Sequence, residues 1–142
     1  MAAWRRALTF GFGVWLIPFA VSLAIAPVKE SWRSLFESVM PVTVSAVAVL
    51  FAVLYFRRSG SSTAGEGARL GVLWLTMSVL IDLPLMLSPP LHYSLREYVA
   101  DVGLTYLIIP IVTVGIAVAA GLGTRTTTES EPASPSKPVE AA

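Results

Sequence analysis

Charged residues are gathered into a few short segments of this chain, and long uncharged runs lie between them. Three runs are fully uncharged, and a fourth, at 70–88, is interrupted only by Asp82. A helix of roughly 20 residues crosses a hydrocarbon core of about 30 Å. A membrane β-barrel would instead show segments of about ten residues with alternating polarity, and these runs do not alternate. The pattern therefore predicts an all-α, integral membrane four-helix up-down bundle with spans at about 7–28, 38–56, 70–88 and 99–122.

Composition supports the same class. The chain has 142 residues, of which 55% are hydrophobic and 13% charged, whereas soluble domains carry about 25% charged residues. The formal net charge of +1 does not favour a nucleic-acid partner, and the absence of cysteine excludes disulfides and thiolate metal sites. With a single histidine, we predict no metal site and no cofactor.

The basic residues predict the orientation, because cytoplasmic loops carry the excess of Lys and Arg. One side of the predicted topology holds seven of the ten basic residues: Arg5, Arg6, Arg57, Arg58, Arg69, Arg125 and Lys137. The other side holds three: Lys29, Arg33 and Arg96. We therefore expect both termini to be cytoplasmic.

The segments outside the spans differ in amino-acid composition. Residues 57–69 are rich in Gly and Ser and predict a flexible cytoplasmic linker, while 125–142, rich in Pro, Ser, Thr and Glu, predict a disordered tail after a membrane domain at 1–124. Residues 1–26 imitate a secretory signal peptide. The apolar run is longer than usual and Pro27 would follow the cut, so we expect an uncleaved span.

Two outer-loop sequences fit the S-x-x-E capping box, in which Ser and Glu bond the free amides of a helix start. They are Ser34–Glu37 and Ser94–Glu97, each at the point where a loop enters a span. We expect both to begin helices.

Asp82 is the main candidate for chemistry. It lies twelve residues beyond Leu70, about 18 Å along a helix, which is too deep for its short side chain to reach water. An ionisable group at such depth costs roughly 2.5–3.5 kcal/mol on insertion scales, so it should face the bundle. Helical spacing places Gly71, Ser78 and Asp82 on one face, which suits close contact with another helix.

Hydroxyl groups at a similar depth on the other spans are the expected partners of Asp82: Ser22, Thr43, Ser45, Thr105 and Tyr106. The outer loops add three cations that could fold down over it: Lys29, Arg33 and Arg96. Prolines within the spans are expected to kink the helices and free backbone carbonyls: Pro18, Pro84 and Pro110.

Three interpretations of Asp82 stay open. It could be a packing device that fixes the register of the spans, a proton or cation site, or one half of an ion pair with a loop cation. The tryptophans Trp15 and Trp74 are interpreted as ordinary packing residues. On the fourth span Gly115, Ala119 and Gly123 recur every four residues, a pattern that suits either packing within the chain or a homo-oligomer.

Three segments carry a resemblance: WLIPFAVSLAIAPVKESWRSLFESVM, LGVLWLTMSVLIDLPLML and SLREYVADVGLTYLIIP. They are similar to segments of an uncharacterised family of small prokaryotic four-span integral membrane proteins with no known activity. The resemblance implies the four-span fold and a bacterial or archaeal plasma membrane. The small multidrug exporters are similar in architecture only, since their essential glutamate lies in the first span, where this chain has no acid.

The sequence contains no Gly-rich phosphate loop and no Ser/His/Asp set, so we expect a non-enzymatic protein. The leading hypothesis is a plasma-membrane protein that acts by association within the membrane. The alternative is a small oligomeric transporter or permease that uses Asp82 as a proton or cation site.

Overall fold

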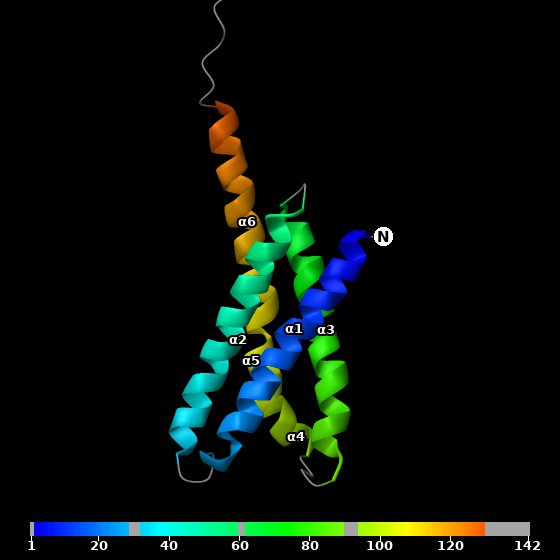
Figure 1. Ribbon diagram of the computed structural model, residues 1–142, viewed down its shortest axis with the longest axis vertical. Helices are drawn as coiled ribbons and strands as arrows, with labels where there is room; N and C mark the ends of the chain where they lie inside the picture. Colours follow the sequence, from blue (N-terminus) through cyan, green and yellow to red (C-terminus); the bar gives the residue numbers. More distant parts are fainter. Residues whose placement is uncertain (1, 29–31, 60–61, 90–93, 130–142) are drawn as a thin grey trace, which may run out of the picture.

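The computed structural model describes residues 2–28, 32–59, 62–89 and 94–129 and contains no strand within them. Its elements, in chain order, are α1 (Ala2–Ile25), the 3-10 turn η1 (Ala26–Val28), α2 (Arg33–Phe56), α3 (Ala64–Leu87), α4 (Leu95–Tyr98), the π-helical η2 (Val99–Gly103), α5 (Leu104–Tyr106) and α6 (Ile108–Glu129). The predicted all-α four-helix bundle is confirmed (Figure 1).

Four stretches are long and apolar enough to cross a membrane: Trp4–Ile25, Arg33–Phe56, Ala64–Leu87 and Leu104–Gly123. They overlap the four predicted spans, but several helices extend further than the apolar runs. α3 takes in 64–69 of the predicted linker, and α6 takes in 125–129 of the predicted tail. Helical hydrogen bonds do not require apolar side chains, so a helix continues into the polar segment beside it. The remainder of the tail, 130–142, lies outside the described residues.

One of the two predicted capping boxes is wrong. α2 begins at Arg33, and its N-cap residue, Trp32, makes no side-chain cap. Glu37 instead bonds the Arg33 side chain at 2.7 Å, because an ion pair one turn apart competes for the same carboxylate. Ser94 does directly precede α4, although the Glu97 side chain lies outside the described ones. An effective cap that the prediction missed is Thr63, whose Oγ1 accepts a hydrogen bond from the Glu66 amide at the start of α3.

α3 packs closely against α6 through small residues. Its buried positions include Gly67, Gly71, Ser78 and Asp82, which follow the helical spacing that the sequence predicts. A Cβ placed on Gly71 would lie 2.5 Å from the Cα of Pro110. The backbones therefore meet at this point, and only glycine leaves the space.

The α6 residues that face α3 are not the predicted small-residue stripe. Gly115 and Gly123 are exposed, and a Cβ added to either would meet nothing within 4 Å. Ala119 is exposed as well. Within the described residues, the close contact between α3 and α6 therefore does not run through the Gly115–Ala119–Gly123 face.

The fourth span is interrupted, whereas the others are continuous. α1 and α3 run unbroken through Pro18 and Pro84, and α2 does so through Pro41, which the prediction overlooked. In the fourth span a π-helical turn is followed by a break at Leu107, three residues before Pro110. Leu107 donates its backbone N–H to the carbonyl of Leu104, three residues back, and Pro110 has no N–H for the carbonyl of Tyr106, so regular α-helical bonding is interrupted at this point.

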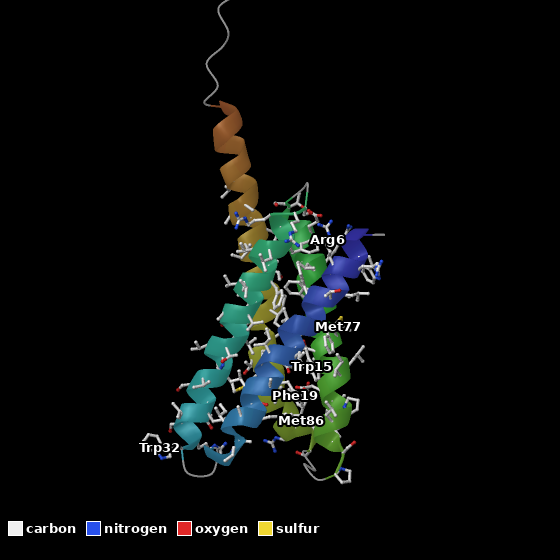
Figure 2. The ribbon with its side chains drawn as sticks, in the orientation of Figure 1. Arg6, Trp15, Phe19, Trp32, Met77 and Met86 are labelled. Carbon is white, nitrogen blue, oxygen red and sulfur yellow. The ribbon has the colours of Figure 1, made fainter. Side chains whose placement is uncertain are left out.

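The helices place four features at one end of the bundle, which we call the linker end: the start of α1, the connection between α2 and α3, the start of α3 and the end of α6, which projects beyond the other helices (Figure 1). Arg6 marks this end, and Trp32 and Met86 lie toward the opposite one (Figure 2). The opposite end, with α4 and the end of α3, is called the Asp82 end.

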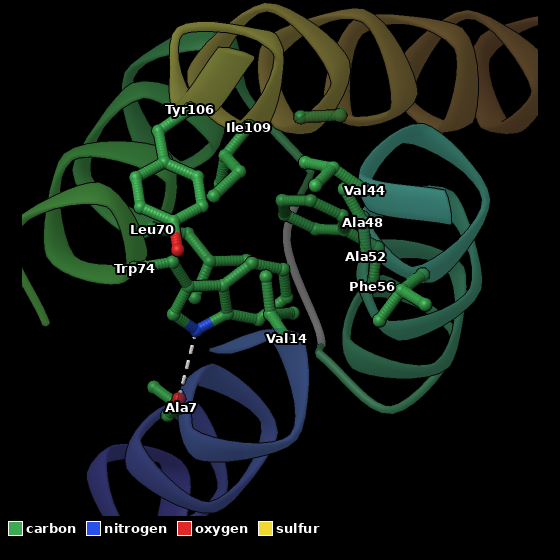
Figure 3. Close-up of a cluster of buried hydrophobic side chains, with 12 residues drawn as sticks. Ala7, Val14, Val44, Ala48, Ala52, Phe56, Leu70, Trp74, Tyr106 and Ile109 are labelled. Carbon is green, nitrogen blue, oxygen red and sulfur yellow. Dashed lines mark hydrogen bonds between the residues drawn. The ribbon is translucent and has the colours of Figure 1, made fainter. Parts of the chain in front are cut away.

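The core joins α1 and α3 around Trp74, whose side chain is completely buried. Its Nε1 donates to the carbonyl of Ala7 at 2.8 Å (Figure 3). A Cβ on Gly11 would lie 2.6 Å from the Trp74 ring, so a glycine one turn further along α1 makes room for the indole. This contact fixes the first part of α1 beside α3.

Candidate functional site

Asp82 points into the bundle and is only 2% exposed. Its Oδ2 accepts a hydrogen bond from Tyr106 Oη at 2.7 Å, and its Oδ1 accepts one from Trp15 Nε1 at 3.1 Å. The donors come from α5 and α1, so one carboxylate on α3 joins three segments of the bundle. Both of its oxygens have partners, which offsets the desolvation of a buried charge.

Of the five hydroxyls expected near Asp82, Tyr106 is the one that bonds it. Three others donate to carbonyls of their own helices: Ser22 to Phe19, Thr43 to Val39 and Ser45 to Pro41. Such local bonds are available to any helical Ser or Thr, so a hydroxyl at the right depth need not turn toward a carboxylate. Thr105 lies beside the site.

Trp15 is the residue that sequence reasoning missed, since it was interpreted as packing. It does pack, with its ring stacked on Phe19 at a centroid distance of 5.0 Å. The signal that could have found it is the need of a buried indole N–H for an acceptor. In α1 and α3, which run in parallel, the pairs Ala7–Trp74 and Trp15–Asp82 are both 67 residues apart.

A cavity of about 280 Å³ reaches the carboxylate. We call it the Asp82 cavity, and its lining residues are Pro18, Phe19, Ser22, Arg33, Phe36, Glu37, Met40, Pro41, Val44, Asp82, Met86, Ala100, Val102, Thr105 and Tyr106. Asp82 is its buried charge, whereas the Arg33 and Glu37 side chains are 74% and 60% exposed. The cavity therefore extends from a buried anion to an exposed ion pair.

The three predicted loop cations differ in where they lie relative to Asp82. Arg33 lines the cavity but pairs with Glu37. Arg96 is exposed on α4, and Lys29 lies outside the described residues. Among the residues that the structure describes, none of these cations bonds Asp82, whose hydrogen-bond donors there are Trp15 and Tyr106.

Two further hydroxyls are buried in this region without a hydrogen-bond partner in the described part of the chain: Ser78 Oγ and Tyr98 Oη. Tyr98 precedes the fourth apolar stretch, at the end of α4. Burial, followed by the negative charge of Asp82, raises the pKa of Tyr98 to about 12. Its phenol is therefore a neutral group with an unused donor near the carboxylate.

The arrangement thus offers one anion held by two donors, two unused hydroxyls and an apolar cavity with a charged mouth. A carboxylate has about four lone-pair positions, and two are occupied here, so Asp82 retains capacity for a further donor or a cation. No family model, curated protein or solved structure matches the chain.

Proposed function

We propose that this protein is a small multi-pass membrane protein that binds a monovalent cation in the Asp82 cavity, as a small permease would. The observation that carries the proposal is that a carboxylate only 2% exposed lines a cavity of about 280 Å³. A carboxylate used for packing alone needs no cavity beside it. An ionisable residue at membrane depth is by default a candidate functional site.

The lining of the Asp82 cavity favours an organic cation with apolar substituents. Its charged side chains are Asp82, Glu37 and Arg33, which leave one net negative charge. Phe19 and Phe36 present aromatic rings, and such rings attract ammonium groups when the site is desolvated. At roughly 30 Å³ per water, the cavity has room for about nine waters, which corresponds to a small organic ammonium ion.

Tryptophan fluorescence provides the measurement, because the Trp15 indole bonds the carboxylate and the other three tryptophans do not line the cavity. Purified protein in detergent is titrated with tetramethylammonium, with potassium and with protons while tryptophan fluorescence is recorded. We expect tetramethylammonium to bind, and Asp82→Asn to weaken its binding at least tenfold. Arg96→Gln is the matched control at the same end of the bundle, since Arg96 is exposed and does not line the cavity.

Two results would contradict the cation site. One is equal binding by wild type and Asp82→Asn, and the other is a fluorescence change that follows pH alone, which would make Asp82 a proton site. Flux of the bound cation into liposomes that contain the wild-type protein then separates a permease from a binding protein.

Association within the membrane is the second proposal, and the open face of α6 supports it. Gly115, Ala119 and Gly123 are small, exposed residues that allow close backbone approach, and a Cβ on either glycine would meet nothing within 4 Å. Because the chain has no cysteine, Ala119→Cys can be crosslinked in membranes without background. We expect crosslinked dimers from Ala119→Cys and few from Leu80→Cys, whose native leucine is 66% exposed on α3. Equal crosslinking would argue against a specific face.

We also propose a bacterial or archaeal plasma membrane with both termini in the cytoplasm. The support is the gathering of arginines at the linker end, including Arg5, Arg6, Arg57, Arg58 and Arg69. Reporter fusions near Gly65 and at the C-terminus should both report cytoplasm. An extracellular signal from either position would contradict this topology.

A further inference from the structure

A second cavity, of about 950 Å³, opens at the linker end between the end of α2, the start of α3 and α6. We call it the linker cavity, and its lining residues are Val53, Phe56, Arg57, Ser59, Ser62, Thr63, Ala64, Ile116, Val118, Ala119, Ala120, Gly121 and Leu122. A Cβ on Gly121 would lie 2.5 Å from the carbonyl oxygen of Ser62. The loop before α3 therefore rests on α6 and forms one border of the cavity.

The lining is apolar where it lies within the spans and polar where it lies beyond them. Val53, Phe56 and Ile116 lie within the apolar stretches of α2 and α6 and form one wall. Arg57, Ser59 and Ser62 follow directly after the α2 stretch or lie in the connection to α3. The cavity thus spans the boundary between the hydrocarbon and the headgroup layer, where a phospholipid has the same division.

The basic residues at the linker end favour a phospholipid with an anionic headgroup. Arg57 is the charged residue of the lining. Around it, the linker-end residues whose side chains are described carry four further arginines and one acid, listed together as Arg5, Arg6, Arg58, Arg69 and Glu66. Basic pockets between helices at the cytoplasmic surface bind anionic headgroups, and Arg forms strong charge-assisted hydrogen bonds to phosphate.

We propose that the linker cavity binds one anionic phospholipid. Its phosphate lies against Arg57 and the hydroxyls of Ser59 and Ser62, and its acyl chains follow the apolar wall formed by α2 and α6. The site is separate from the Asp82 cavity and does not depend on the proposed cation binding.

Native mass spectrometry of the purified full-length protein tests the site with two lipids that differ in headgroup charge, dioleoyl phosphatidylglycerol and dioleoyl phosphatidylcholine. One basic residue near a membrane surface contributes about 1 kcal/mol, or about a fivefold preference. We expect wild type to prefer phosphatidylglycerol by about that factor and Arg57→Gln to lose the preference.

Arg58→Gln is the matched control, because it removes the same charge from the adjacent residue, which does not line the cavity. It should keep most of the preference. Ala120→Phe fills the cavity without changing charge and should reduce binding of both lipids, while glycerol phosphate in excess should not displace the bound lipid. Unchanged helicity by circular dichroism shows that the variants fold.

Several outcomes would overturn the proposal. Equal effects of Arg57→Gln and Arg58→Gln would indicate diffuse surface charge, and displacement by glycerol phosphate would indicate an anion site without a lipid. A wild type without headgroup preference would also contradict it. A dimer that Ala120→Phe disrupts, with no lipid bound, would make a second copy of the chain the occupant.

Discussion

The two ends of this bundle differ in how deeply the main charged residue of each cavity is buried. At the Asp82 end, a cavity of about 280 Å³ contains a carboxylate that is 2% exposed and accepts two hydrogen bonds. At the linker end, a cavity of about 950 Å³ has an exposed arginine, Arg57, at its border. The first cavity buries a carboxylate behind the exposed Arg33–Glu37 pair, whereas the second leaves its charged residue open to solvent or headgroups.

The difference follows from how closely the helices approach. Near Asp82, an indole from α1 and a phenol from α5 reach the same carboxylate, so burial of the charge is compensated. At the linker end α6 projects beyond the other helices (Figure 1), and the described residues place no comparable set of hydrogen-bond acceptors around Arg57. A charge can be placed inside a membrane bundle only where several helices bring partners to it.

The largest expected effect tests the contact that lies between the two cavities. Gly71→Leu places a side chain against the backbone at Pro110, so α3 and α6 must separate. Overpacking typically costs 1–3 kcal/mol and more where backbones collide, and we expect a loss of about 3 kcal/mol in the free energy of unfolding.

Gly115→Leu is the control for that change, since a Cβ there meets nothing within 4 Å. Its effect should stay within about 0.5 kcal/mol, because a residue with higher helix propensity replaces an exposed glycine. Thermal unfolding in detergent, followed by circular dichroism, measures both variants. Similar melting temperatures for the two variants would show that the α3–α6 contact does not hold the bundle together.

The next effect concerns how the Asp82 end encloses its charge. Asp82→Ala leaves two buried donors, Trp15 Nε1 and Tyr106 Oη, without an acceptor. Unpaired buried donors cost about 1–3 kcal/mol in soluble proteins, but hydrogen bonds in membrane proteins contribute less, about 0.6 kcal/mol on average. We therefore expect a loss of about 2 kcal/mol for the two together.

Asp82→Asn should cost less, about 1 kcal/mol, for a chemical reason. The amide oxygen can accept from Trp15, which only donates, and the amide nitrogen can donate to Tyr106 Oη, which can also accept. Chemical denaturation of both variants distinguishes the cases. Equal losses would mean that the charge of Asp82, and not its hydrogen bonds, stabilises this end.

The sequence predicted the bundle well because hydrophobicity and length determine spanning helices directly. It also predicted the buried face of α3 around Gly71, Ser78 and Asp82, since helical spacing places them together. The ends of the helices were predicted less well. α3 begins at Ala64 and α6 continues to Glu129, because backbone hydrogen bonding extends past the point where the apolar residues stop.

The partners of Asp82 could be predicted only in part. Tyr106 followed from depth, but Ser22, Thr43 and Ser45 satisfy their hydroxyls on their own helices. Trp15 was missed because only hydroxyls were expected as partners and its indole was interpreted as a packing group, although a buried indole N–H also needs an acceptor. Which side chain reaches a buried charge depends on rotamers and helix crossing, and the sequence pattern does not record these.

A smaller loss of stability is expected when Tyr106 loses its hydroxyl. Tyr106→Phe removes the 2.7 Å bond to Asp82 and keeps the ring that fills the core. The expected loss is about 1 kcal/mol, a typical value for one hydrogen bond to a charged group in a membrane protein. Tryptophan fluorescence should change as well, since Trp15 and Tyr106 bond the same carboxylate. An unchanged stability together with unchanged fluorescence would mean that the carboxylate does not depend on this donor.

The smallest effect is expected at Tyr98, the other phenol near Asp82. Its Oη is buried and has no hydrogen-bond partner in the described part of the chain, so Tyr98→Phe removes a desolvated polar atom without breaking a bond. Stability should stay the same or rise by up to about 1 kcal/mol. Chemical denaturation beside Tyr106→Phe tests this, because the two changes remove the same atom from the same residue type. A loss at Tyr98 as large as at Tyr106 would mean that this hydroxyl also has a partner, such as a water or a cation bound beside Asp82. The Asp82 end would then hold a bound molecule beside the two protein donors, and the contrast between the two ends would extend to what each one binds.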